Sequence, residues 1–201
     1  MSAPGVSILM VCTGNICRSP MMERLMRAAL ERRGAGQWCE VSSAGMWAQA
    51  GEPMQPFAAS TLAERDVDAD GFVATPVNEE LLKSAELILT ATLEHRSAVV
   101  GIVPSAVRRT FTMLELARIA GAAPPPPGPA DLGDADQVRR SIAWAAQMRG
   151  SIARAPEGAD DLEDPLGAPP DVYSARADAI TAAVEQIVPF LMGGQPSTQA
   201  G

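Results

Sequence analysis

An apolar run followed directly by the octapeptide CTGNICRS constrains the fold of this chain more than any other feature. Val6 to Val11 is continuously apolar, which is typical of a strand covered on both faces of a sheet. The octapeptide that follows, Cys12 to Ser19, cannot extend that strand, and a helical pattern begins after it. Ser19 and Pro20 are expected as the N-cap and the first residue of the helix. The sequence therefore predicts a strand, a loop and a helix in immediate succession.

The rest of the chain alternates short apolar segments with helical patterns. Three more strands are predicted near residues 39–43, 86–92 and 107–113, with helices between and after them near 57–64, 81–85, 95–103 and 114–120. This alternation predicts an α/β fold in which a parallel sheet lies between two layers of helices. Beyond a proline-rich break at 123–129, we expect an exposed helix over 137–149, an acidic loop and a long helix over 172–192.

The length of 201 residues suggests a single domain, which we place at residues 1–192, with a disordered tail at 193–201. No apolar run is long enough to span a bilayer, and the N-terminus lacks the pattern of a secretory signal. The three cysteines are an odd number, and Cys12 and Cys17 lie in one loop. Such usage does not suit a disulfide scaffold, so we expect a reducing, cytoplasmic setting.

The net charge of −8 argues against nucleic acid and anionic membranes as partners, and no basic run occurs. An acidic protein can bind an anion only through local donors. This requirement directs attention to the loop after the first strand, because loops at helix N-termini concentrate free backbone N–H groups.

The residues of this loop suit the capture of an oxyanion beside a thiolate. Gly14 permits the backbone angles that turn successive N–H groups inward, and Arg18 offers a planar fork of donors to two phosphate oxygens. The same positive surroundings favour the charged form of a thiol, so Cys12 is expected to be a thiolate near neutral pH. Ser19 can donate a hydrogen bond to that sulfur, and Asn15 can bond the loop's own backbone.

The segment VCTGNICRSPMME resembles the phosphate-binding loop of the low-molecular-weight protein tyrosine phosphatases. The resemblance continues through SSAG, GEPMQP, ELILTAT, HR, RRTFT and the late EDPLG. It implies a four-stranded parallel sheet, no metal or cofactor, and a phosphocysteine intermediate formed from a phosphotyrosine protein or a small aryl phosphate. In this sequence it implies that Cys12 is the nucleophile, that Arg18 binds the phosphate and the transition state, that Asn15 orders the loop and that Ser19 assists the sulfur. The remaining loop residues that would surround the phosphate are Thr13, Gly14, Ile16 and Cys17.

A general acid must protonate the phenolate that leaves, and it must come from another segment. The acidic loop DDLEDP offers Asp160, Asp161 and Asp164, and the residue types alone do not separate them. Pro165 restrains Asp164 to extended geometry and so directs its carboxyl group. The resemblance implies the same choice, since the family carries its acid in a late Asp-Pro pair.

Two further residues have two interpretations each. Cys17 could pair with Cys12 under oxidation, as the resemblance implies for some members, or it could be a small loop residue without a redox role. Trp47 could form a wall of the substrate slot or could anchor its loop. His95, the only histidine, is expected to pack or hydrogen-bond at a helix start, and Cys39 is expected in the core. Leu166 stands where the family often has an aromatic residue.

Two rival functions deserve comparison with a phosphatase. A thiol-dependent arsenate reductase on the same fold needs further cysteines to relay a disulfide, and none occurs around ELILTATLEHRS or VRRTFTM. A non-catalytic phosphate-binding module needs neither a thiol nor an acid, so the trio Cys12, Arg18 and Asp164 argues against it. No role is predicted for residues 120–158, which exceed the length of compact family members.

Overall fold

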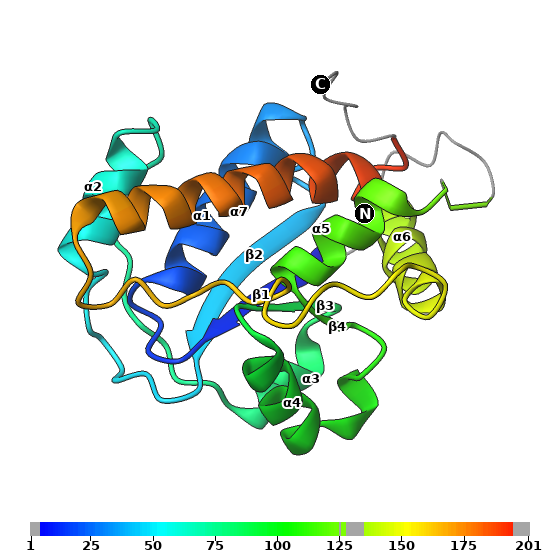
Figure 1. The fold of residues 1–201 in the computed structure, drawn as a ribbon, viewed down its shortest axis with the longest axis horizontal. Helices are drawn as coiled ribbons and strands as arrows, with labels where there is room; N and C mark the ends of the chain where they lie inside the picture. Colours follow the sequence, from blue (N-terminus) through cyan, green and yellow to red (C-terminus); the bar gives the residue numbers. More distant parts are fainter. Residues whose placement is uncertain (1–4, 125, 128–134, 195–201) are drawn as a thin grey trace.

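A four-stranded parallel sheet in the order β2-β1-β3-β4 forms the centre of the molecule (Figure 1). The computed structural model describes residues 5–124, 126–127 and 135–194. The strands are β1 (Val6–Cys12), β2 (Cys39–Gly45), β3 (Leu87–Thr90) and β4 (Thr110–Thr112). This sheet, with helices on both faces, confirms the predicted α/β architecture.

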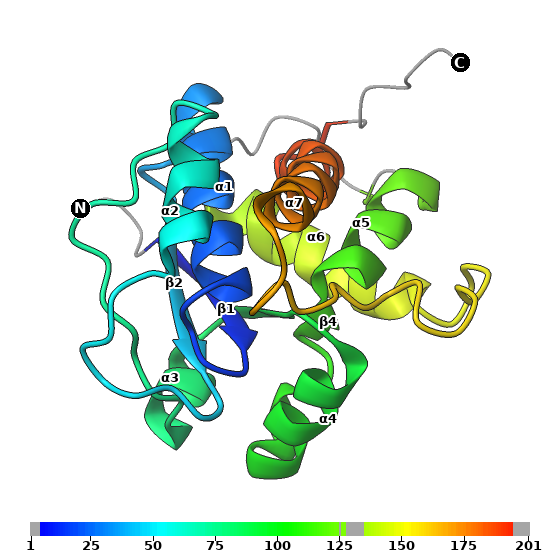
Figure 2. The same cartoon turned by 60° about the vertical axis from the view of Figure 1, so that its left-hand side comes forward.

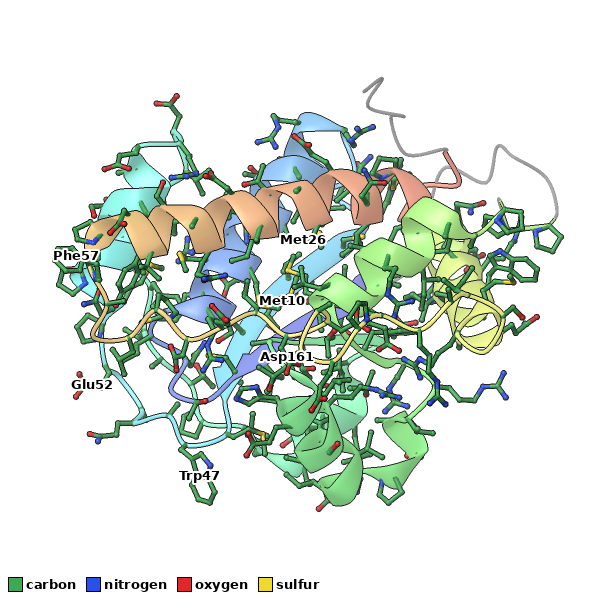
Figure 3. All side chains as sticks on the ribbon, in the orientation of Figure 1. Met10, Met26, Trp47, Glu52, Phe57 and Asp161 are labelled. Carbon is green, nitrogen blue, oxygen red and sulfur yellow. The ribbon has the colours of Figure 1, made fainter. Side chains whose placement is uncertain are left out.

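Strand β1 lies inside the sheet because its side chains are apolar on both faces. Ile8 and Met10 belong to the larger hydrophobic cluster, whereas Leu9 and Val11 belong to the smaller one on the other face. None of the four side chains is more than 2% exposed. Met10 shares the larger cluster with Met26, and both lie in the interior in Figure 3.

The helices divide between the two faces of the sheet (Figure 2). Residues of five helices fill the larger cluster: α1 (Arg18–Arg32), α2 (Pro56–Ala63), α5 (Met113–Ala122), α6 (Ala135–Met148) and α7 (Pro170–Leu191). The opposite face is covered by α3 (Glu79–Ser84) and α4 (Leu93–Ile102). The carboxyl ends of all four strands point to one edge, where ligands bind in open parallel sheets.

The first helix begins two residues earlier than the sequence predicts, at Arg18 instead of Pro20. Cys17 is its N-cap residue, and Ser19 and Pro20 already lie within the first turn. The Ser19 hydroxyl does not cap the helix because it lies 3.0 Å from the sulfur of Cys12. Proline is tolerated in the first turn because those N–H groups have no partner within the helix.

The prediction that the helix near 137–149 is exposed is wrong. Helix α6 buries one face against α5, α7 and β1, because small and apolar residues recur along it at helical spacing: Val138, Ser141, Ile142 and Ala145. The predicted break at 123–129 and the predicted tail lie partly outside the described residues. Gly193 and Gly194 are described, and their N–H groups bond to carbonyl groups of the last turn of α7.

Candidate active site

The loop between β1 and α1 surrounds a small cavity of about 90 Å³ at the carboxyl edge of the sheet. Strand β1 delivers Cys12 to this edge, and the N-terminus of α1 begins on the other side of the loop. The loop thereby joins the positive end of a helix dipole to a row of backbone N–H groups, an arrangement that favours anions. The cavity is lined by Cys12, Thr13, Gly14, Ile16, Cys17, Arg18, Asp164 and Leu166.

The sulfur of Cys12 lies 3.0 Å from the hydroxyl oxygen of Ser19. Both side chains are buried, Cys12 with 2% of its surface exposed and Ser19 with none. The hydroxyl of Ser19 also accepts a hydrogen bond from Nδ2 of Asn15 at 2.8 Å. Because Asn15 supplies a hydrogen to the hydroxyl oxygen, Ser19 can donate its own hydrogen to the sulfur of Cys12 at 3.0 Å or to the carbonyl of Ala44 at 3.4 Å, and the sulfur is the nearer acceptor.

Asn15 holds the middle of the loop. Its backbone has φ of 55°, the left-handed region that asparagine tolerates better than most residues. Its side chain is fully buried, donates to the hydroxyl groups of Ser19 and Ser43, and accepts the N–H of Thr75 at 2.8 Å. Ser43 in turn donates to the carboxylate of Glu23 at 2.6 Å. The predicted ordering role thus has a geometric basis that extends to three separate segments.

Gly45 allows the loop to lie against the end of β2. A Cβ atom at this position would meet the carbonyl oxygen of Thr13 at 2.6 Å and the backbone nitrogen of Asn15 at 2.7 Å. The residues after Gly45 continue the contact, since Met46 donates its N–H to the carbonyl of Cys12 at 2.9 Å. Sequence reasoning did not identify this position as part of the site. The only signal was the glycine that ends SSAG at the expected carboxyl end of the second strand.

Arg18 and Asp164 meet at the cavity from distant parts of the chain. Nη2 of Arg18 donates to Oδ2 of Asp164 at 2.6 Å and to the hydroxyl of Thr13 at 3.1 Å. Nη1 donates to the carbonyl of Leu162 at 3.3 Å. The Arg18 side chain is only 6% exposed, whereas that of Asp164 is 44% exposed. The guanidinium is therefore fixed beneath the cavity, and the carboxylate stands at its mouth.

The structure separates the three acids that the sequence left open. Asp160 receives two hydrogen bonds from the guanidinium of Arg118, at 3.1 and 2.7 Å. Asp161 accepts the backbone N–H of Leu93 at the first turn of α4, at 2.7 Å. Of the three, Asp164 is the one that lines the cavity. This placement supports the predicted choice of Asp164.

His95 hydrogen-bonds on both sides of its ring, as expected for a histidine at a helix start. Nε2 lies 2.9 Å from the hydroxyl of Thr13, and Nδ1 lies 2.6 Å from the hydroxyl of Thr92, the N-cap of α4. Burial, followed by the charge of Arg18, lowers the pKa of His95. A neutral imidazole therefore links the loop to α4.

Cys17 and Cys39 are buried thiols. Burial is the main cause that raises the pKa of Cys17 to about 11, and a contact with the hydroxyl of Tyr173 at 3.9 Å opposes it. Burial also raises the pKa of Cys39 to about 11, and this residue lies in the core as predicted. All three cysteines are free. The protective pairing of Cys17 with Cys12 stays a prediction.

Trp47 stands beside the loop without lining the cavity. Its backbone N–H donates to the carbonyl of Thr13 at 2.8 Å, yet 81% of the residue's surface is exposed and its ring points away from the body of the protein (Figure 3). A role as a wall of the substrate slot therefore stays a prediction, one that would need a substrate extending beyond the small cavity.

The described part of the chain contains neither a cluster of metal ligands nor a membrane-spanning helix. Across residues 5–124, 126–127 and 135–194, no group of three or more His, Cys, Asp or Glu side chains is arranged to hold a metal ion. None of the helices in these same ranges combines the length and apolar character needed to cross a membrane.

Sequence comparison places the loop within a known family. The sequence model described as "Low molecular weight phosphotyrosine protein phosphatase" matches residues 7–121. The chain is 36% identical over 110 residues to a protein-arginine-phosphatase of Bacillus subtilis (strain 168), covering 55% of this chain and 71% of that protein. It is 36% identical over 105 residues to the low molecular weight protein-tyrosine-phosphatase Etp of Escherichia coli (strain K12), covering 52% of this chain and 67% of that protein. The segment matched by the family model contains the loop and ends before Asp164.

Solved structures agree over nearly the whole fold. A YwlE mutant from Bacillus subtilis superposes with a TM-score of 0.66 at 26% identity, covering 91% of this chain and 96% of that chain. The low molecular weight protein tyrosine phosphatase of T. tengcongensis gives a TM-score of 0.66 at 26% identity, covering 92% and 98%. These findings confirm the predicted resemblance. The chain belongs to the low molecular weight phosphotyrosine protein phosphatase family of cysteine-dependent phosphatases.

Proposed function

We propose that this protein hydrolyses phosphotyrosine in proteins, or small aryl phosphates, through a phosphocysteine intermediate. The observation that carries the proposal is the convergence of Cys12, Arg18 and Asp164 on one cavity beside a helix N-terminus. A cysteine-to-serine mutant of the YwlE arginine phosphatase, similar to this chain at 26% identity with a TM-score of 0.66, has been solved with a phosphorylated active-site serine. That finding supports the proposal that a covalent intermediate forms on Cys12, the cysteine that ends β1 and lines the cavity.

In the first step, the thiolate of Cys12 attacks phosphorus and forms an S–P bond while the P–O bond to the aryl group breaks. The electron pair of that bond leaves with the phenolic oxygen, and Asp164 donates the proton that the oxygen needs. Arg18 and the loop N–H groups stabilise the charge on the three equatorial oxygens. Ser19 donates to the sulfur, which stabilises the thiolate before attack and again when it leaves.

In the second step, water attacks phosphorus and the S–P bond breaks. Asp164, now ionised, accepts the proton of that water, and Cys12 departs as a thiolate. The products are inorganic phosphate and the starting enzyme. A carboxylate at the cavity mouth suits both proton transfers, since the leaving group and the attacking water occupy the same side of phosphorus.

The cavity lining favours an aryl leaving group. Ile16 and Leu166 contribute apolar surface, and a phenyl ring gains from burial against such side chains, whereas a phosphorylated guanidinium would lose hydration there. The curated relatives nevertheless include an arginine phosphatase as well as tyrosine phosphatases. The assay must therefore compare the two substrate classes directly.

The test uses purified protein with a phosphotyrosine peptide, a phosphoarginine peptide, phenyl phosphate, and arsenate with a thiol reductant. We expect turnover of the phosphotyrosine peptide and phenyl phosphate. Cys12→Ser should abolish turnover and retain phosphate binding. Full activity of this variant, or turnover of arsenate without phosphatase activity, would overturn the proposal. Preference for phosphoarginine would keep the mechanism and change the substrate class.

The two rival functions fit the site less well. A disulfide relay for arsenate reduction would have Cys17 and Cys39 to use, but Cys39 begins β2 whereas Cys12 ends β1 in the parallel pair, so Cys39 lies at the opposite edge of the sheet. A binding module would have no use for the acid at the cavity mouth.

We further propose a cytoplasmic location, which three free thiols support. We also propose a single domain over residues 1–192, because one core cluster contains residues from Val6 to Leu191.

A further inference from the structure

The chain between α5 and α7 contains α6 and a long loop, residues 149–169, that carries Asp164 and is called the acid loop below. The first part of this segment coincides with residues 120–158, for which the sequence predicts no role. Among the contacts that hold this segment to the body of the protein, two anchors are made by arginine guanidinium groups and lie on either side of the first part of the loop. The first is Arg149, which follows α6. The second is Arg118 of α5, which binds Asp160 four residues before Asp164.

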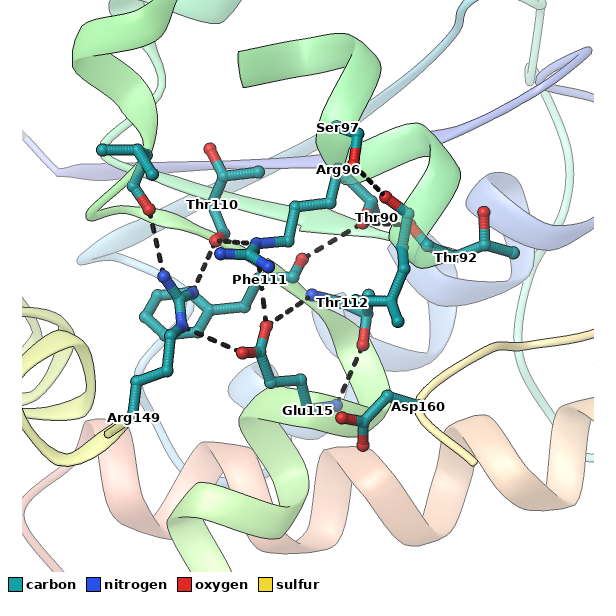
Figure 4. A network of polar contacts seen from close by, with 12 residues as sticks. Thr90, Thr92, Arg96, Ser97, Thr110, Phe111, Thr112, Glu115, Arg149 and Asp160 are labelled. Atoms are coloured by element: carbon teal, nitrogen blue, oxygen red, sulfur yellow. Dashed lines mark hydrogen bonds and ion pairs between the residues drawn. The ribbon is translucent and has the colours of Figure 1, made fainter. Parts of the chain in front are cut away.

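The first anchor is Arg149, directly after α6. Its guanidinium lies 4.0 Å from the centre of the Phe111 ring and forms an ion pair with the buried carboxylate of Glu115 at 2.9 Å (Figure 4). It also donates to the carbonyl of Thr110 at 2.6 Å and to that of Val107 at 3.1 Å. These contacts fix the start of the loop against β4 and α5.

The second anchor is Arg118, on α5. Its Nε and Nη2 atoms donate to the two carboxylate oxygens of Asp160, at 3.1 and 2.7 Å, while Nη1 donates to the carbonyl of Ala153 at 2.6 Å. The Asp160 side chain is only 13% exposed. A planar guanidinium that binds a carboxylate with two parallel bonds fixes direction as well as distance. Arg118 therefore ties together two points of the loop that are seven residues apart.

The path from Asp160 to the cavity is supported at each step. The carboxylate of Asp161 accepts the N–H of Leu93, and the N–H of Leu162 donates to the carbonyl of Ala91 at 2.8 Å. Leu162 is 1% exposed, so its side chain is locked in the core. The loop thus enters the site along one constrained route that begins at the Arg118–Asp160 pair.

We propose that Arg118 is a positioning residue for the general acid Asp164 and acts through its bidentate pair with Asp160. The proposal rests on the proposed function, because it assigns the pair a role in delivering the proton to the leaving group. General acids act only within hydrogen-bond reach, and a shift of about 1 Å can cost about a hundredfold in rate. The segment beyond α5 therefore holds the carboxyl group of Asp164 at a fixed position relative to the cavity.

The test compares kcat/KM for two aryl phosphates that differ in their need for an acid. Phenyl phosphate expels a basic phenolate that needs a proton, whereas 2,4-dinitrophenyl phosphate expels a stable anion that does not. We expect Arg118→Ala and Asp160→Ala each to lower kcat/KM for phenyl phosphate by about tenfold and to change that for the dinitro substrate by less than about twofold. The double variant should match Arg118→Ala, because that substitution already removes the pair with Asp160 together with the hydrogen bond to Ala153.

Loss of folded protein lowers both rates equally, so the ratio between the two substrates isolates positioning from stability. Arg118→Lys keeps the positive charge but cannot form two parallel hydrogen bonds to Asp160. Its ratio of kcat/KM between the two substrates should lie between those of the wild type and Arg118→Ala. Asp178→Asn is the matched control. Asp178 lies on α7, and its carboxylate pairs with Arg65 instead of with any residue of the acid loop. An equal fall in both rates, or no fall in either, overturns this proposal while leaving the proposed function intact. A wild-type protein that hydrolyses neither substrate overturns the proposed function, and with it this proposal.

Discussion

The carboxylate of Asp164 and the guanidinium of Arg18 lie 2.6 Å apart at the mouth of the cavity, although 146 positions separate them in the chain. A bound phosphate would approach the same guanidinium. In its ionised form, Asp164 therefore carries a charge of the same sign as the bound anion, and the two share one cation. This relationship has opposite consequences for binding and for catalysis.

Replacing Asp164 by alanine should strengthen the binding of inorganic phosphate and weaken catalysis. Removing one negative charge near the anion relieves about 1 kcal/mol of repulsion, which is about fivefold in affinity. Loss of the acid should lower kcat/KM for phenyl phosphate by about 10²–10³-fold. Competitive inhibition by phosphate and steady-state kinetics measure the two effects. Glu163→Gln, which removes an exposed acid one residue away, should change neither, and weaker phosphate binding in Asp164→Ala would contradict the expectation.

Gly45→Ala should inactivate the enzyme by displacing the loop. The added Cβ would lie within 3 Å of backbone atoms of Thr13, Gly14 and Asn15, none of which can move without shifting the row of N–H groups. We expect kcat/KM to fall by about 100-fold, since misplacement of the loop by about 1 Å suffices for that. Gly101→Ala is the control, because a Cβ there meets nothing within 4 Å. Equal activity of the two variants would show that the loop tolerates the displacement.

Asn15 allows its hydrogen bonds to be separated from its backbone angle. Asn15→Gly and Asn15→Ala both lose the bonds to Ser19, Ser43 and Thr75, but only alanine adds strain at φ of 55°. We expect urea unfolding to show a loss of about 2–4 kcal/mol for glycine, and about 1 kcal/mol more for alanine. A glycine variant as stable as the wild type would mean that these buried bonds contribute nothing to stability.

The predicted site residues that line the cavity come mostly from one continuous stretch of the chain. Cys12 to Ser19 is a continuous segment, so the strand before it and the helix after it already determine where its N–H groups point. Asp164 could not be distinguished from Asp160 by residue type, because the choice depends on Arg118, a partner 42 positions earlier in the chain. The contribution of Gly45 was missed for a similar reason. Gly45 matters because the end of β2 lies against the loop that follows β1. Residues near Gly45 in the sequence do not show this contact.

The burial of α6 was also missed. Its alanines and serine are small enough to suit either an exposed helix or a closely packed one, so composition did not decide between them. The burial of one face of α6 depends on the elements that it packs against, which are α5, α7 and β1. The helix start at Cys17 differs from the expected cap at Ser19 because the hydroxyl group is used by the site instead.

Peroxide treatment tests the redox role predicted for Cys17. Oxidation of the Cys12 thiolate gives a sulfenic acid, and attack by the Cys17 sulfur would form the disulfide and release water. Because burial raises the pKa of Cys17 to about 11, its thiolate is scarce at neutral pH, and disulfide formation should accelerate as the pH rises from about 7 to about 9. Mass spectrometry detects the link. Sulfinic acid on Cys12 without any Cys12–Cys17 link would exclude a protective role.

Alkaline pH should destabilise the protein through its buried thiols. The pKa values of Cys17 and Cys39 are both raised from 9.0 to about 11, so between these limits the unfolded chain releases protons that the folded state retains. Stability is then fully present below about pH 9 and falls as the pH rises toward 11, by at most about 5 kcal/mol in total for the two thiols. Urea unfolding at successive pH values measures this slope. Cys39→Ala removes one of the two thiols and should reduce the slope between about pH 9 and pH 10 by about half. Above that range Tyr173 also contributes, because burial raises its pKa from 10.0 to about 12. An unchanged slope between about pH 9 and pH 10 in that variant would show that the loss has another source.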